Sequence, residues 1–97
     1  MAFKIVWSPE AVQQLHEISE YIARDSTTYA AGVILHIIEA AERLADHPRL
    51  GRRVPEWDRD ELREVLSGNY RIIYRVGNGR VDITDVMHGA QQLRQEP

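Results

Sequence analysis

Four polar side chains in the second half of the chain have the types and spacing that chemistry requires. Arginine guanidinium groups bind phosphates and carboxylates through paired hydrogen bonds, and a histidine can donate or accept a proton near neutral pH. If the four converge on an open sheet face, they form an anion-binding site with an acid–base group beside it. The candidates are Arg63, Arg71, Arg75 and His88.

The same residues have an ordinary structural interpretation that the sequence leaves open. Arg71 or Arg75 could pair across strands with Glu64 or Asp82 on a solvated face, where each pair contributes little to stability. His88 could hydrogen-bond a neighbouring carbonyl and hold the chain terminus. Neither interpretation excludes the other before the register of the strands is known.

Other kinds of site are disfavoured by what the sequence lacks. There is no cysteine, so disulfides and thiolate metal sites are excluded. His16, His36 and His47 have no metal-ligand spacing with each other or with His88, and we predict no metal and no cofactor. No P-loop, G-x-S-x-G or dinucleotide glycine pattern is present, which argues against an ordinary metabolic enzyme.

Length and charge narrow the class of protein. A chain of 97 residues predicts a single domain over residues 1–97. The net charge of -3 argues against a protein that holds nucleic acid by broad phosphate neutralisation. The short apolar run at residues 5–7 ends at Ser8-Pro9, so we expect no signal peptide, no membrane span and a cytoplasmic protein.

A small sheet must position these side chains, and residues 70–76 are its predicted middle strand. Alternation places two sets of side chains on opposite faces. One set is Tyr70, Ile72, Tyr74 and Val76, and the other is Arg71, Ile73 and Arg75. Turn signals at 67–69 and 77–79 join this strand to strands at 62–66 and 80–88, which together make a three-stranded antiparallel meander.

The first half of the chain predicts a strand and a helical hairpin. Residues 3–7 are apolar and β-branched, and Ser8 can cap a helix that begins at Pro9 and runs to about Arg24. Val12 belongs to its apolar stripe. After a turn at 25–28, a second helix runs to about His47, before Pro48. Its stripe consists of Ala30, Ile34, Ile37, Ile38, Ala41, Leu44 and Ala45.

These elements predict an α+β fold with the helical hairpin packed on one face of a small sheet. The tyrosine-bearing face is the first choice for that contact. Gly32 inside the second helix suggests close approach to the first helix. Residues 49–61 predict a long surface loop, and residues 89–97 a flexible tail. Trp7 and Trp57 are predicted to be a core residue and a loop anchor rather than a base-stacking platform.

Taken together, the pattern resembles toxins of the RelE/ParE superfamily, the toxic half of bacterial type II toxin–antitoxin pairs, and is most similar to the ParE branch. The order and spacing of five pieces carry the resemblance. They are Trp7-Ser8-Pro9-Glu10-Ala11 with Leu15, Ile18 and Tyr21-Ile22; residues 44–52; Arg63-Glu64; residues 70–76; and Val86-Met87-His88-Gly89.

The resemblance implies a toxin that arrests growth, is associated with plasmid stabilisation, and is neutralised by a cognate antitoxin. Operator DNA would be bound only through the antitoxin. ParE-like members are associated with poisoning DNA gyrase, and RelE-like members with cutting mRNA in the ribosome. Docking in a ribosomal site rewards a strongly basic protein surface, and this chain is acidic overall, so we favour a gyrase-directed toxin that is not an enzyme.

The alternative is a ribosome-dependent mRNA endonuclease, whose catalytic set would be Arg63, Arg71, Tyr74, Arg75 and His88. A second alternative is an inactive toxin-like binding domain. Many relatives carry an arginine shortly after the histidine, and this chain has Gln91.

We expect antitoxin to be bound in two ways. An apolar groove walled by the helical hairpin should accept a partner helix. Arg63, Arg71 and Arg75 should form a solvent-open cationic patch opposite the tyrosine face, which an acidic tail could neutralise.

Overall fold

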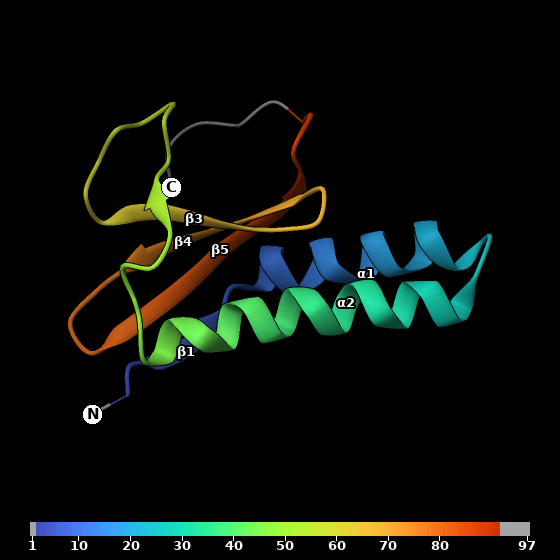
Figure 1. Ribbon diagram of the computed structural model, residues 1–97, viewed down its shortest axis with the longest axis horizontal. Helices are drawn as coiled ribbons and strands as arrows, with labels where there is room; N and C mark the ends of the chain where they lie inside the picture. Colours follow the sequence, from blue (N-terminus) through green and yellow to red (C-terminus); the bar gives the residue numbers. More distant parts are fainter. Residues whose placement is uncertain (1, 92–97) are drawn as a thin grey trace.

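Residues 2–91 are described by the computed structural model, and they form an open five-stranded sheet with two helices on one face (Figure 1). The predicted α+β architecture of strand, helical hairpin and antiparallel meander is confirmed. In chain order the elements are β1 (Lys4–Trp7), α1 (Pro9–Ala23), α2 (Thr27–Glu42), a 3-10 turn (Arg43–Ala45), β2 (Arg52–Arg53), β3 (Leu62–Ser67), β4 (Tyr70–Val76) and β5 (Arg80–His88). The order of strands across the sheet is β1-β5-β4-β3-β2.

Serine caps begin both helices. The Ser8 hydroxyl accepts a hydrogen bond from the Ala11 N–H at 3.0 Å and donates one to the Thr84 carbonyl at 3.1 Å, which ties the start of α1 to β5. Ser26 caps α2 by accepting from the Tyr29 N–H at 3.0 Å. Because Ser26 is the cap, α2 starts at Thr27 and the turn between the helices is shorter than predicted.

The main core lies between the helical hairpin and the tyrosine face of the sheet. Ile72 and Tyr74 are fully buried there, as predicted from parity. Val12, placed by periodicity in the stripe of α1, is 41% exposed, so that assignment was wrong. The buried members of this core are Ala11, Ile37, Ala40, Ala41, Leu44, Ile72, Tyr74, Val81, Ile83 and Val86, with Trp7 packed against them.

The first strand joins the edge of the sheet by a non-local contact. β1 runs parallel to β5, with Lys4 opposite Arg80 and Trp7 opposite Ile83. Beyond the end of β1, the side chain of Gln14 takes over the edge of β5: its Oε1 accepts from the Val86 N–H at 2.7 Å. An amide side chain thus satisfies backbone that a longer strand would have paired.

The segment predicted as a long irregular loop contains more order than its sequence indicates. β2 is a two-residue strand that pairs antiparallel with β3. The residues after it, 54–61, fold over the sheet face opposite the helices and are called the strap below (Figure 1). Val54 is fully buried, and together with Trp57 it packs against Ile73 and Met87. Trp57 is therefore the loop anchor that the sequence predicted.

Two further predictions concern Gly32 and the chain after β5. A side chain at Gly32 would have no heavy atom within 4 Å, so the expected close approach to α1 is wrong. Of the predicted flexible tail 89–97, Gly89 and Ala90 form a turn after β5, and residues 92–97 lie outside the described residues.

Two features are absent from residues 2–91. No described helix combines the length and the apolar character needed to cross a bilayer. Within the same residues, no group of three or more histidine or acidic side chains could hold a metal ion.

Candidate functional site

Arg71 does not lie on an open surface. Its residue is only 8% exposed, and the strap covers that face of the sheet. Its Nη1 and Nη2 donate to the two carboxylate oxygens of Glu56 at 2.9 and 3.0 Å, and its Nε donates to Glu64 at 2.9 Å. The hydrogen bonds that Arg71 donates to Glu56 and Glu64, together with the charges of both carboxylates, outweigh burial and raise the pKa of Arg71. The predicted solvent-open patch is therefore wrong for this residue.

Glu64 is the buried centre of that network. Its side chain has no exposed surface, yet both of its oxygens are bound, one by Arg71 and the other by the Nε of Arg52 at 2.8 Å. The partnership of Arg71 with Glu64 is the cross-strand pair offered as the ordinary interpretation, although it is buried rather than solvated. Carboxylates accept four hydrogen bonds from this largely buried guanidinium, which has five N–H donors, so at most one donor remains for a phosphate.

The register of the strands separates Arg63 from Arg71. Arg63 on β3 lies directly opposite Tyr74, whereas Arg71 lies opposite Leu66. Residues directly opposite each other point to the same face, so Arg63 belongs to the tyrosine face. The prediction that Arg63 would join Arg71 and Arg75 on one face is wrong, because the turn after β3 sets the other register.

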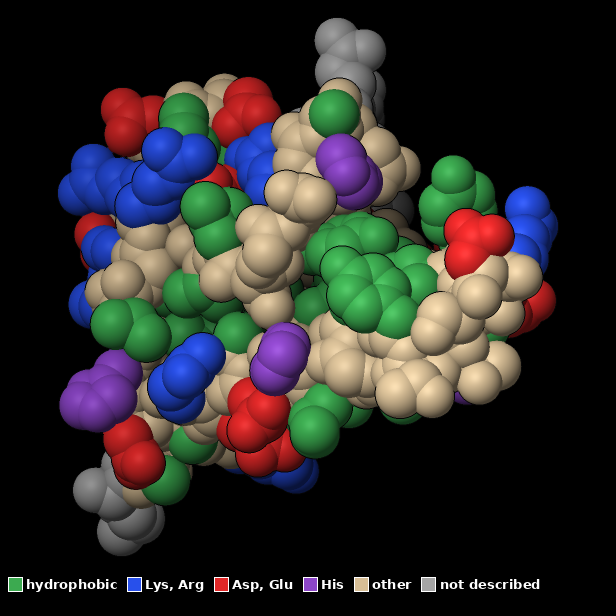
Figure 2. All heavy atoms as spheres, turned by 45° about the vertical axis from the view of Figure 1, so that its right-hand side comes forward, with side chains coloured by type: hydrophobic (Ala, Val, Ile, Leu, Met, Phe, Trp, Pro, Cys, Tyr) green, Lys and Arg blue, Asp and Glu red, His purple; other side chains and the backbone are tan. Residues whose placement is uncertain are grey.

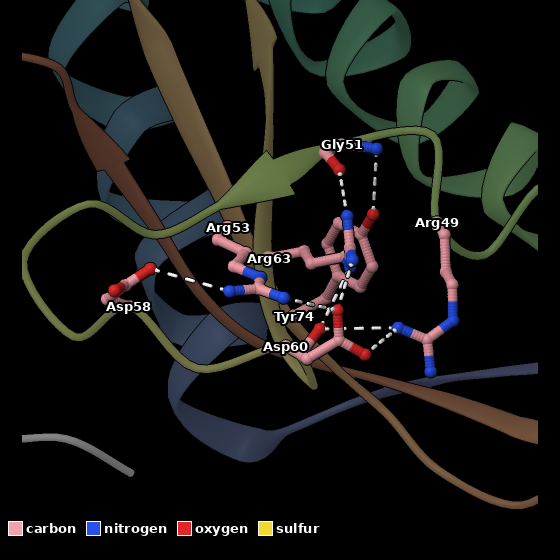
Figure 3. A network of polar contacts seen from close by, with 7 residues as sticks. All are labelled: Arg49, Gly51, Arg53, Asp58, Asp60, Arg63 and Tyr74. Carbon is pink, nitrogen blue, oxygen red and sulfur yellow. Dashed lines mark hydrogen bonds and ion pairs between the residues drawn. The ribbon is translucent and has the colours of Figure 1, made fainter.

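Arg63 instead takes part in an arginine cluster around one carboxylate, that of Asp60 (Figure 3). Its Nη2 donates to Asp60 Oδ1 at 2.7 Å, its Nε to the Asp60 carbonyl at 2.9 Å and its Nη1 to the Gly51 carbonyl at 2.9 Å. Arg49 pairs with the second carboxylate oxygen, and Arg53 donates to Oδ1 at 3.3 Å. We call Arg49, Arg53 and Arg63 the arginine triad.

Partial desolvation raises the pKa of the Asp60 carboxyl, but the hydrogen bonds and charges of Arg63 and Arg49 outweigh it, so the pKa lies below its ordinary value. Asp60 is therefore ionised at neutral pH. It acts as the counter-ion that holds the triad together.

Tyr74 is a buried anchor rather than an exposed acid. It is 0% exposed, and its hydroxyl accepts a hydrogen bond from the Gly51 N–H at 3.0 Å. Burial raises the pKa of its phenol. A Cβ at Gly51 would lie 2.2 Å from the Glu64 carbonyl oxygen and 2.8 Å from this hydroxyl, so only glycine permits the approach. The pair fixes the chain between Arg49 and Arg53.

The remaining candidates, Arg75 and His88, lie away from the triad. Arg75 is half-buried opposite Asp82 on β5. His88 is exposed opposite Tyr70, with the two rings edge to face at a centroid distance of 5.6 Å. Its Nδ1 accepts from the Ala90 N–H at 3.2 Å. His88 on β5 thus lies beside the first residue of β4, whereas Tyr74 lies four residues further along β4.

A groove runs between α2 and β3. The short strand β2 pairs only with Arg63 and Glu64 of β3, so the rest of the β3 edge is open along this groove. Figure 2 shows hydrophobic side chains gathered in the hollow between helices and sheet. Leu50 and Leu66 beside it are 58% and 61% exposed. One part, of about 510 Å³, is lined by Thr28, Tyr29, Gly32, Val33, His36, Ser67, Gly68, Asn69 and Tyr70. The next, of about 460 Å³, is lined by Ala40, Arg43, Leu50, Gly51, Arg52, Glu64, Val65 and Leu66.

The sequence and the fold of this chain are both similar to those of known proteins. The sequence model of a family described as the ParE toxin of the type II toxin–antitoxin system parDE matches residues 5–93. The chain belongs to the ParE toxin family. This ParE-family toxin is also 34% identical over 89 residues to the Toxin RelE2 of Caulobacter vibrioides, a match that covers 91% of this chain and 97% of that one.

Solved structures share the fold of this ParE-family toxin. A chromosomal ParDE system from P. aeruginosa superposes with a TM-score of 0.75 at 17% identity, over 90% of this chain and 96% of that chain. The toxin–antitoxin complex RelBE2 from Mycobacterium tuberculosis gives a TM-score of 0.65 at 21% identity, over 91% and 99%. At these identities the likeness shows the fold alone.

Of the triad and its carboxylate in this ParE-family toxin, sequence reasoning singled out only Arg63. Arg49, Arg53 and Asp60 lie in the segment predicted as an irregular loop. The available signal was a run of four charged residues, three of them acidic, from Asp58 to Glu61, after three arginines within five positions. That pattern is typical of a charge cluster but does not say which carboxylate the arginines share.

Proposed function

We propose that this chain is a growth-inhibiting toxin that poisons DNA gyrase, is not an enzyme, and is neutralised by a cognate antitoxin. The observation that carries the proposal is the enclosure of Arg71 between Glu56 and Glu64. A nuclease needs cationic groups free to stabilise the phosphorane that forms during cleavage. Here the most buried arginine of the sheet is already neutralised by two carboxylates. A toxin directed at a protein needs no such catalytic set.

The alternative, an mRNA endonuclease, is disfavoured by where its other candidates lie. The Tyr74 hydroxyl is occupied by the Gly51 N–H, and Arg63 faces the opposite side of the sheet from Arg71. His88 pairs with Tyr70, four residues along β4 from Tyr74, which at strand geometry is roughly 13 Å away. A general acid and base must reach one reacting centre, and these groups do not surround one.

The groove between α2 and β3 is the proposed antitoxin site. Its apolar lining and exposed leucines match an amphipathic partner segment. Operator DNA would then be bound only through the antitoxin.

Three parallel assays test the proposed target. Expressed alone in bacteria, the protein should arrest growth and leave filamented cells with damaged DNA. Purified protein should inhibit supercoiling by gyrase, and translation extracts should keep their mRNA intact. Co-expression of the product of an adjacent short reading frame should restore growth.

Two other outcomes of these assays would favour the alternative functions. Ribosome-dependent cleavage with gyrase unaffected would establish the endonuclease alternative. No effect in either assay, together with binding to the neighbouring gene product, would establish an inactive binding domain.

A further inference from the structure

Three arginines bind the carboxylate of Asp60, as they would bind an anionic ligand, yet about half of this side chain is exposed to solvent. Its side chain is 49% exposed, and those of Arg49 and Arg53 are 53% and 51% exposed, whereas that of Arg63 is 14% exposed. Water and a partner can therefore reach the carboxylate and two of the three guanidinium groups. The arrangement shows that the triad accepts a carboxylate in this position.

The triad does not depend on that carboxylate alone for its shape. Arg63 is also bound to two backbone carbonyls, those of Gly51 and Asp60, and Arg53 lies 3.7 Å from the carboxylate of Asp58. With Asp60 and Asp58 as counter-ions, three guanidinium groups face two carboxylates, and one net positive charge remains. A second carboxylate from outside is thus attracted, and Asp60 competes with it for the same donors.

The position of the triad indicates the partner. Arg49 is followed by Leu50 and Gly51, which line the groove proposed for the antitoxin, and Arg53 follows Arg52 of the same lining. A segment lying in the groove passes beside the triad. Its apolar residues would meet Leu50, and the next residues along it would meet arginine.

We propose that the arginine triad binds acidic side chains of the antitoxin and that Asp60 is a built-in competitor that lowers this affinity. The proposal rests on the proposed toxin–antitoxin function, because the occupant is the antitoxin segment in the groove. The ligand chemistry is a peptide carboxylate, since the carboxylate of Asp60 already accepts hydrogen bonds from all three arginines of the triad.

A peptide titration tests the idea without the antitoxin. Purified protein is titrated with fluorescein-labelled hexaglutamate, and with hexaglutamine as the uncharged control, at several salt concentrations. We expect salt-sensitive binding of the acidic peptide only. Arg49→Ala and Arg53→Ala should each weaken it about threefold, and Asp60→Asn should strengthen it about threefold.

Matched variants separate the site from net charge. Arg24→Ala removes an exposed cation and Glu20→Gln an exposed anion, both on or beside α1 and far along the chain from the triad. They should leave the affinity unchanged. Thermal unfolding of each variant verifies that it is folded. If Asp60→Asn is not folded, variants of the half-exposed Arg49 and Arg53 still test whether the triad binds the peptide, and Asp60→Ala tests the competition.

Several outcomes would overturn the inference. Weaker binding by folded Asp60→Asn would show that Asp60 positions the arginines and does not compete. If the control variants changed the affinity as much as the triad variants do, the net charge of the protein would explain the binding. If single-stranded DNA bound more tightly than hexaglutamate, the triad would be a phosphate-binding site. A protein that binds the peptide as expected but fails to arrest growth would refute the toxin proposal and leave the site intact.

Discussion

Arg71 connects three parts of the fold through its guanidinium group, because β4 carries it, β3 supplies Glu64 and the strap supplies Glu56. Removing it would leave Glu64, whose side chain is fully buried, with the exposed Arg52 as its remaining ion-pair partner within residues 2–91 and with one carboxylate oxygen stripped of its donor. A buried carboxylate that loses one of its two counter-charges is far more costly than the loss of a surface pair. This residue is thus structural, and its replacement tests the fold.

We predict that Arg71→Ala lowers the free energy of unfolding by about 3–5 kcal/mol. Arg80→Ala is the matched control, because Arg80 is 57% exposed and pairs with Asp82 two positions along the same strand. It should change stability by less than about 1 kcal/mol. Urea unfolding measures both, and similar losses in the two variants would contradict the buried network.

We predict that Tyr74→Phe destabilises by about 1–3 kcal/mol, because the buried Gly51 N–H loses its acceptor. Tyr21→Phe removes a hydroxyl from a residue that is 67% exposed and should have almost no effect. Thermal unfolding compares the two. If Tyr74→Phe were neutral, water or another group would have to satisfy Gly51.

At the scale of elements, the start of α1 is fixed twice and the start of α2 once. Ser8 caps its helix and also bonds to Thr84 of β5, whereas Ser26 only caps its helix. We predict that Ser8→Ala costs about 1–2 kcal/mol and Ser26→Ala about 1 kcal/mol or less. Denaturant unfolding should give this order, and the reverse order would show that the tie to β5 contributes nothing.

The strap is held partly by an acid-sensitive contact. The hydrogen bond from Arg71 lowers the pKa of Glu56 below its ordinary value of 4.5, more than burial raises it. A carboxyl with a depressed folded-state pKa stabilises the fold above its unfolded pKa, and this contribution is lost as pH falls through the folded value. Stability from this contact is therefore complete above about pH 5 and lost at lower pH.

We predict that Glu56→Gln lowers stability at pH 7 and makes unfolding less dependent on pH below 4.5. The curves of the variant and the natural chain should converge in acid. Urea midpoints from pH 3 to pH 7 measure this. Asp46→Asn, at an exposed position after the 3-10 turn, serves as the control of equal charge. Parallel curves at all pH values would show that Glu56 does not hold the strap.

At the scale of the whole molecule, stability and partner binding reside on different surfaces. We predict that Leu66→Asp changes stability by no more than about 0.5 kcal/mol, because the residue is 61% exposed, but weakens antitoxin binding at least about tenfold. Leu35→Asp, at a 56% exposed position of α2 outside the groove lining, should bind normally. Calorimetric titration with the neighbouring gene product compares the variants, and equal binding by both would place the antitoxin elsewhere.

The sequence alone determined the two helices, the longer strands and the two faces of β4, because those follow from local periods and caps. Alternation along β4 put Ile72 and Tyr74 against the helices, and Ser8 marked where α1 begins. The order of these elements was also sufficient to predict the α+β fold and the family. Each of these signals lies within a few residues of the feature that it specifies.

Only the tertiary structure decided which charges meet. The pairing register of β3 with β4 turned Arg63 to the tyrosine face, and the strap buried Arg71 against Glu56, fifteen residues before it in the chain. Asp60 gathered three arginines from a segment with no periodic pattern. Register and loop closure depend on contacts between residues far apart in the sequence, so no local pattern could specify this site.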